Sequence, residues 1–114
     1  MAIFGNLGID TVDVSTSDTT ILNVSATQYE RVAVSAFSLH NDGVVDISVE
    51  VFISPDATSA SGDRVARIAI SAGGSADVNE LIGQGYDDTK YIVAKANVVG
   101  VNASLSYTGY TEGS

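Results

Sequence analysis

The sequence predicts an all-β protein, a single antiparallel β-sandwich of immunoglobulin-like or jelly-roll kind with about seven to eight strands. Val, Ile and Thr make up 33 of the 114 residues, whereas Leu contributes five and Met one. β-Branched side chains lose rotamer freedom in a helix and fit a pleated sheet. Apolar and polar residues alternate in several segments, and eleven glycines fall at intervals that suit turns.

The clearest strand covers residues 45–53. Val or Ile occupies every odd position, and Asp46, Ser48 and Glu50 alternate with these apolar residues. A period of two over this length places one face in a core and the other in water. By weaker alternation elsewhere, we expect the full set of strands to cover residues 9–14, 20–24, 31–40, 45–53, 65–71, 90–98 and 101–108.

Three connections have a recognisable composition. Asn41-Asp42-Gly43 suits a tight turn, so we predict an antiparallel hairpin between residues 31–40 and 45–53. Pro55 ends the strong strand because proline cannot donate to a ladder. Residues 76–84 have apolar side chains at helix-like spacing, which predicts either a short helical turn or a strand that crosses between sheets.

The length fits one domain over residues 1–114. Within residues 1–8, the segment 3–8 carries three large apolar side chains, Ile3, Phe4 and Leu7, ahead of the first clear strand. This segment either packs back onto its own domain or forms an arm that reaches a neighbour and makes assembly contacts. Residues 111–114 are expected to be a loose tail.

Charge and composition exclude several classes of function. Fourteen acidic residues face five basic ones, for a formal charge of −9, and the basic residues are scattered along the sequence. Phosphate backbones require clustered Lys and Arg, so nucleic acid is not an expected partner. We see no signal peptide and no membrane span, and expect synthesis in the cytoplasm without membrane contact. The lack of cysteine excludes disulfides, Fe–S clusters and thiol catalysis in these residues.

No residue pattern predicts catalysis, a metal site or a cofactor. His40 is the single histidine, and no nucleophile-elbow pattern frames any serine around it. A zinc site would lack Cys or a second His. The carboxylate pairs Asp10/Asp13 and Asp87/Asp88 lack the spacing of a calcium loop, so turn chemistry and solvated charge explain them better. We therefore expect a protein that is not an enzyme.

A carbohydrate- or receptor-binding module is the alternative from a different class. It would use the loops at residues 56–63 and 83–90, with Tyr86, Asp87 and Asp88 as the ligand-loop residues. Tyr86, Tyr107 and Tyr110 would supply a small stacking surface. The chain contains no tryptophan, which weakens both a lectin and a glycosidase interpretation.

Residues 45–108 show a familiar order of features. A strong strand leads into Ile53-Ser54-Pro55-Asp56, followed by a Ser/Ala/Gly loop and a strand over residues 64–70. A Gly-rich turn, the phrase Asn79-Glu80-Leu81-Ile82-Gly83-Gln84-Gly85 and two closing strands complete it. This order resembles the small β-sandwich proteins of tailed bacteriophage particles, which decorate capsids or join the neck, tail and fibres. The likeness spans a little over half of the chain.

The resemblance implies a virion component, often threefold, that acts through surface contacts and has no common catalytic residues. It implies the major capsid protein or another virion protein as partner, besides further copies of the chain, with a trimer favoured. On this basis our first hypothesis is a capsid decoration or cement protein, located in the virion. A position in the neck, tail or fibre stays open, as do the contacting loops and any bound glycan or calcium.

Overall fold

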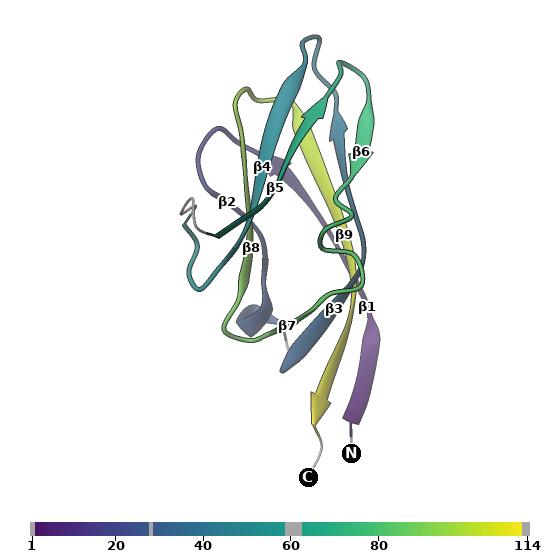
Figure 1. The fold of residues 1–114 in the computed structure, drawn as a ribbon. Helices are drawn as coiled ribbons and strands as arrows, with labels where there is room; N and C mark the ends of the chain where they lie inside the picture. The colour runs from purple at the N-terminus through teal and green to yellow at the C-terminus, as the bar shows by residue number, and fades with distance from the viewer. Residues whose placement is uncertain (1, 28, 59–62, 113–114) are drawn as a thin grey trace.

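The computed structural model describes residues 2–27, 29–58 and 63–112, with the backbone alone for residues 2–11 and 110–112. Within these residues, nine strands form two antiparallel sheets that pack face to face (Figure 1). Sheet A contains β1 (Ala2–Val14), β9 (Val101–Glu112), β3 (Arg31–Asn41), β6 (Ser75–Asp77) and β7 (Gly85–Asp87). Sheet B contains β2 (Thr19–Asn23), β8 (Tyr91–Ala96), β4 (Ile47–Ser54) and β5 (Arg64–Ile70). The predicted all-β sandwich is confirmed.

The strand order decides between the two predicted kinds of sandwich. Sheet A has the order β1-β9-β3-β6, with β7 also pairing with β3, and sheet B has the order β2-β8-β4-β5. Most consecutive strands therefore lie in opposite sheets, and β4–β5 is a hairpin within one sheet. If β6 and β7 are taken as one interrupted edge strand, this is the order of a jelly roll.

The predicted hairpin between residues 31–40 and 45–53 is wrong. β3 belongs to sheet A and β4 to sheet B, so Asn41-Asp42-Gly43 begins a connection that crosses the sandwich. The side chain of Asn41 explains this geometry. It is fully buried and donates to the carbonyls of Val45 (2.8 Å) and Ile70 (3.0 Å), which holds the chain in an arch between the sheets.

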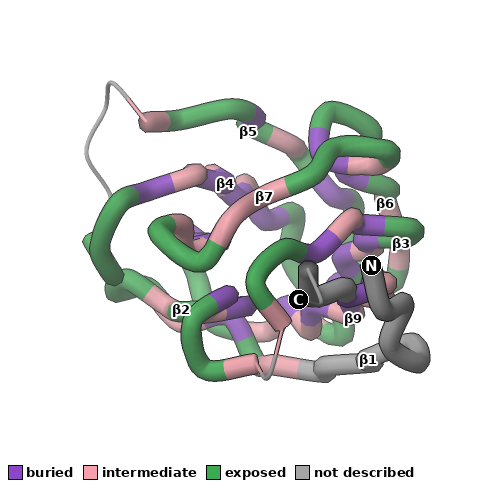
Figure 2. The backbone as a smooth tube through the Cα atoms, turned by 90° about the horizontal axis from the view of Figure 1, so that it is seen from below, coloured by how far each residue is buried: buried purple, intermediate pink, exposed green. Residues whose placement is uncertain are grey.

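The core lies between the two sheets, and its largest buried side chains include Phe37, Leu39, Leu81, Ile92 and Leu105. Figure 2, which looks along the sandwich from the end that carries the termini, shows buried segments inside and exposed turns around them. The predicted alternation in residues 101–108 is confirmed, because the odd-numbered residues of this strand are buried.

A β-bulge explains the weaker alternation in β3. The pairing of β3 with β9 shifts register between Val34 and Ala36. Val34 before the shift and Phe37 after it both point into the core, whereas Ala36 is exposed. An extra residue at a bulge reverses the phase of the side chains, so both halves of the strand contribute to the core.

Residues 76–77 end β6, and residues 78–84 form turns, neither a helix nor a strand that crosses between the sheets. After β6 the chain continues through turns along the same edge of β3, where Val78 N donates to Phe37 O (2.8 Å) and Gly83 N donates to Val34 O (2.8 Å). Val78 and Leu81 are fully buried. The helix-like spacing therefore reflects two inward side chains on successive turns, which close one edge of the core.

The first and last strands pair over almost their whole length. β1 begins at Ala2, opposite Glu112, so the backbone of the segment proposed as an arm is part of sheet A. β9 continues to Glu112, and the strand therefore extends into the expected tail, of which residues 113–114 lie outside the described part. The two strands run together to the end of the molecule where both termini lie (Figure 1).

Candidate functional site

Four exposed valines gather at the end of the sandwich opposite the termini. Val44 is 93% exposed and Val99 is 66% exposed, and Val45 and Val98 are also exposed. They belong to the β3–β4 and β8–β9 connections, which touch through a hydrogen bond from Asp42 N to Gly100 O (2.8 Å). We call Val44, Val45, Val98 and Val99 the valine tip.

Close packing beneath the tip fixes its two connections. The Asn41 carboxamide oxygen accepts from Gly43 N (2.8 Å), in addition to the two bonds that its amide group donates. Gly100 has a φ of +129°, and a Cβ there would lie 3.3 Å from the Ile47 side chain and 3.5 Å from Gly43. Its conformation and the crowding together favour glycine. The exposed valines are therefore carried on a well-supported base.

Acidic residues flank the valine tip. Asp13 and Asp42 line a groove of about 310 Å³ together with Val99, and Asp46 follows Val45 directly. All three carboxylates are exposed. No Lys or Arg occurs in the two connections or lines this groove, so the described part of the tip combines apolar and negatively charged surface.

Beside the tip, Ser75, His40 and Asp42 form a hydrogen-bonded chain in the order of a hydrolase triad. His40 Nδ1 lies 2.7 Å from Ser75 Oγ, and His40 Nε2 lies 2.8 Å from Asp42 Oδ1. Asn102 donates to the other oxygen of Asp42. Sequence reasoning did not select this serine, because the pairing of β6 with β3, which sets Ser75 opposite His40, is a long-range contact.

The surroundings of these three hydrogen-bonded side chains differ from those of a hydrolase site. The His40 and Asp42 side chains are about half exposed, at 49% and 54%. The nearby backbone N–H groups of Gly73 and Gly74 already donate to Asn41 O (3.0 Å) and Ser71 O (2.8 Å), so neither is free to stabilise an oxyanion. The chain of hydrogen bonds instead links β9, β3 and β6 across sheet A.

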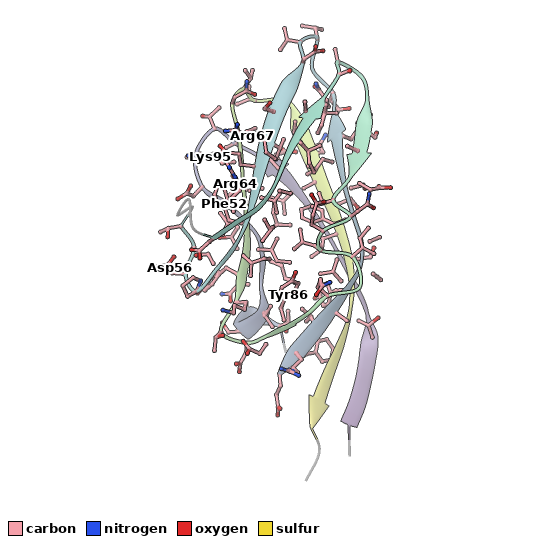
Figure 3. All side chains as sticks on the ribbon, in the orientation of Figure 1. Phe52, Asp56, Arg64, Arg67, Tyr86 and Lys95 are labelled. Atoms are coloured by element: carbon pink, nitrogen blue, oxygen red, sulfur yellow. The ribbon has the colours of Figure 1, made fainter. Side chains whose placement is uncertain are left out.

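A second surface lies on the outer face of sheet B. A groove of about 410 Å³ is lined by Thr16, Ser48, Glu50, Arg67, Lys95, Ala96 and Asn97. In the strand register, Glu50 on β4 lies opposite Arg67 on β5 and opposite Lys95 on β8. The three charged residues therefore form one row across the sheet. Arg64 reaches the same carboxylate, and Figure 3 shows Arg64, Arg67 and Lys95 together on this side. We call the surface formed by Arg64, Arg67, Lys95 and Glu50 the basic groove.

Glu50 is the electrostatic centre of the basic groove. Arg64 Nη1 donates to Glu50 Oε2 at 2.9 Å, and this hydrogen bond lowers the pKa of Glu50 below its ordinary value of 4.5. Partial burial acts in the opposite direction, and the charges of Arg67, Arg64 and Lys95 lower the pKa further. One carboxylate thus stands among three cations, and the groove carries a net positive charge.

The predicted ligand loop is partly used for structure. Tyr86 lies on β7, opposite Val32, and packs against the core, where burial raises the pKa of its hydroxyl. Asp87 Oδ1 accepts from the Thr89 hydroxyl and from Thr89 N, and these bonds lower the pKa of Asp87. Asp88 is exposed. Ligand binding by these three residues stays a prediction.

The other aromatic residues do not join Tyr86 in a described stacking surface. Tyr107 is buried in the core at 8% exposure, and the side chain of Tyr110 lies outside the described residues. The backbone of Ile3, Phe4 and Leu7 belongs to β1, whereas their side chains lie outside the described residues. Their role as assembly contacts stays a prediction.

Among the residues whose side chains are described, 12–27, 29–58 and 63–109, no group of three or more His, Cys, Asp or Glu side chains is arranged to hold a metal ion. No helix of the described chain is long and apolar enough to cross a membrane.

Sequence reasoning missed both surfaces. The valine tip has a signal in the sequence, since two Val-Val pairs stand directly beside glycine, at Gly43-Val44-Val45 and Val98-Val99-Gly100. Apolar pairs within turn sequences are the feature that would have identified it. The basic groove has no local signal, because its residues come from three strands that only the sheet brings together.

Comparison with known proteins relates the fold of this chain to a solved structure. No protein-family model matches the chain, and no curated protein matches it. Among solved structures, the fold is similar to that of a protein from Bacillus endospore appendages, described as a novel family of disulfide-linked pili. The TM-score is 0.58 at 11% sequence identity, over 97% of this chain and 89% of that one. This likeness establishes a shared β-rich fold.

Proposed function

We propose that this protein is a structural subunit that assembles with further copies of itself through surface contacts. The observation that carries the proposal is the valine tip, with Val44 at 93% exposure and Val99 at 66%. Clustered exposed apolar side chains on a rigid base mark interaction sites, because their contact with water is unfavourable. The fold likeness to an appendage protein of the pilus class is consistent with assembly.

Within this class, we propose a bacteriophage virion protein that decorates and stabilises the capsid, with the trimer as the favoured oligomer. Support comes from the resemblance over residues 45–108 and from the jelly-roll strand order, which occurs in viral capsid domains. The major capsid protein would be its partner and the virion its location. Neck, tail and fibre positions are variants of the same proposal.

An appendage subunit is the second candidate, favoured by the fold likeness. The appendage proteins are described as disulfide-linked, whereas this chain has no cysteine, so its copies would be held together without disulfides. Electron microscopy of concentrated protein distinguishes the candidates, because filaments favour the appendage subunit and discrete rings favour the capsid protein.

Sedimentation velocity over a wide dilution series tests the general proposal. We expect the wild type to self-associate. The Val44→Ser, Val99→Ser double variant should have a dissociation constant for self-association at least tenfold higher, a loss of about 1.4 kcal/mol or more. Ala36→Ser is the control, since Ala36 is exposed on the outer face of sheet A, away from the tip. A wild type that is monomeric at every concentration would overturn the proposal.

A further inference from the structure

The distribution of basic residues in this acidic protein is uneven. The formal charge is −9, with five basic residues. Three of these, Arg64, Arg67 and Lys95, lie in the basic groove. The other two, Arg31 and Lys90, lie near Asp87, whose pKa both of them help to lower. The basic groove is therefore the described region with an excess of positive charge.

The cations of the groove are incompletely neutralised. Arg64 is hydrogen-bonded to Glu50 at 2.9 Å, but Arg67 Nη2 lies 3.7 Å from the same carboxylate. Among the described side chains, the Lys95 ammonium is within ion-pair or hydrogen-bond distance of none, and it acts on Glu50 through its charge alone. The Arg67 side chain is 62% exposed. Two charged heads on aliphatic stems are thus available to a partner, and the stems offer apolar surface beside the charges.

The valine tip has the complementary character. Its valines would meet the aliphatic stems, and its flanking carboxylates Asp13 and Asp46 would meet the cations. Two molecules that each carry a charge of −9 repel unless a contact places opposite charges together. The acidic tip against the basic groove is such a contact.

We propose that the valine tip of one copy docks on the basic groove of a second copy. This inference rests on the proposed function and names the surface that receives the tip. The contact joins two different patches, so each copy offers one tip and one groove. Such an arrangement closes into a ring or continues as a chain, depending on the rotation between neighbours.

Charge exchange between the two surfaces tests the proposal. Arg67→Glu, Lys95→Glu reverses the groove, and Asp13→Lys, Asp46→Lys reverses the flanks of the tip. We expect each double variant to weaken self-association at least tenfold in sedimentation velocity at low salt. Combining all four substitutions in one chain restores the formal charge of −9 and pairs a basic tip with an acidic groove. We expect this chain to associate within about threefold of the wild type, as will an equimolar mixture of the two double variants.

Controls separate this contact from effects of net charge and of folding. Lys90→Glu and Asp88→Lys change the charge at the end of the sandwich near the termini, away from the valine tip. Each should leave the dissociation constant of self-association within about threefold of the wild-type value. Circular dichroism and thermal unfolding confirm that each variant is folded.

The possible outcomes separate the two proposals. If groove reversal has no effect, or if the combined chain associates no better than either double variant, the proposed docking is wrong. Should Val44→Ser, Val99→Ser still weaken association at least tenfold in that case, the assembly function stands and the tip docks elsewhere. A wild type without self-association would overturn both.

Discussion

The two ends of the sandwich differ in whether their large apolar side chains are packed or exposed. At the end near the termini, Tyr29 and Tyr86 pack against the core, and the Tyr29 ring lies directly over Gly109. At the other end, the Asn41 side chain ties the β3–β4 connection to the end of β5, while Val44 in this connection is 93% exposed. One end uses its large side chains for stability, and the other holds its valines outside the core. The exposed valines are therefore free to serve contact with a partner.

The largest expected effect is on stability at the end near the termini. A Cβ on Gly109 would lie 2.0 Å from Tyr29 Cδ2 and 2.3 Å from Tyr29 Cγ, so Gly109→Ala must displace the ring. Overpacking of this kind costs about 3 kcal/mol, and the Tm should fall by about 10 °C or more. Thermal unfolding measures this shift. In a Tyr29→Ala background, Gly109→Ala should lower the Tm little further, and such non-additivity would identify the clash as its cause.

The second effect concerns the base of the valine tip. Asn41→Ala removes three hydrogen bonds from a fully buried position and leaves the carbonyls of Val45 and Ile70 without this donor. We expect a loss of about 2–3 kcal/mol in the free energy of unfolding. Denaturant unfolding gives the value, and hydrogen exchange should show faster exchange at Gly43 N. An unchanged stability would contradict the view that Asn41 supports the tip.

A pair of matched substitutions compares buried and exposed valines directly. Val34 is 1% exposed in the core, and Val44 is 93% exposed in the tip. We expect Val34→Ala to cost about 2 kcal/mol and Val44→Ala to change stability by less than about 0.5 kcal/mol. Denaturant unfolding of both variants checks the difference. Equal losses would mean that Val44 is buried in the folded protein and would remove the basis of the tip.

A smaller effect is the pH dependence of the basic groove. The pKa of Glu50 is lowered in the folded protein below its ordinary value of 4.5. The ionised carboxylate therefore stabilises the fold at pH values above that ordinary pKa. This contribution is lost as the pH falls through the lowered pKa. Glu50→Gln should be less stable than the wild type at neutral pH, and the two should converge in acid. A stability difference that persists unchanged in acid would exclude the ion pair as its source.

The smallest expected effect is at Ser75. Because the neighbouring Gly73 and Gly74 N–H groups are already engaged, we expect Ser75 to be unreactive toward a fluorophosphonate probe despite its bond to His40. Intact-mass spectrometry after incubation measures labelling, with Ser75→Ala as the control. Specific labelling of Ser75 that requires His40 would instead indicate a nucleophilic serine.

The sequence determined the local features of this fold. Alternation of apolar and polar residues identified the strand at 101–108 and residues 47–51 of the strand predicted at 45–53, because side chains on a strand alternate between its faces whatever its neighbours are. The prediction was wrong at the two ends, since Val45 is exposed before β4 begins and Phe52, on the face predicted to lie in water, is buried. The composition also determined the strand-rich class and the acidic surface. Both follow from properties of single residues or of short segments.

The tertiary structure alone decided which strands pair and which surfaces result. Asn41-Asp42-Gly43 has the composition of a hairpin turn, yet the buried Asn41 amide holds it as a crossing between sheets. Arg67 and Lys95 meet at Glu50 through pairing of three strands. Pairing partners depend on long-range packing, which alternation leaves undetermined since it specifies the face of a side chain and not the neighbouring strand.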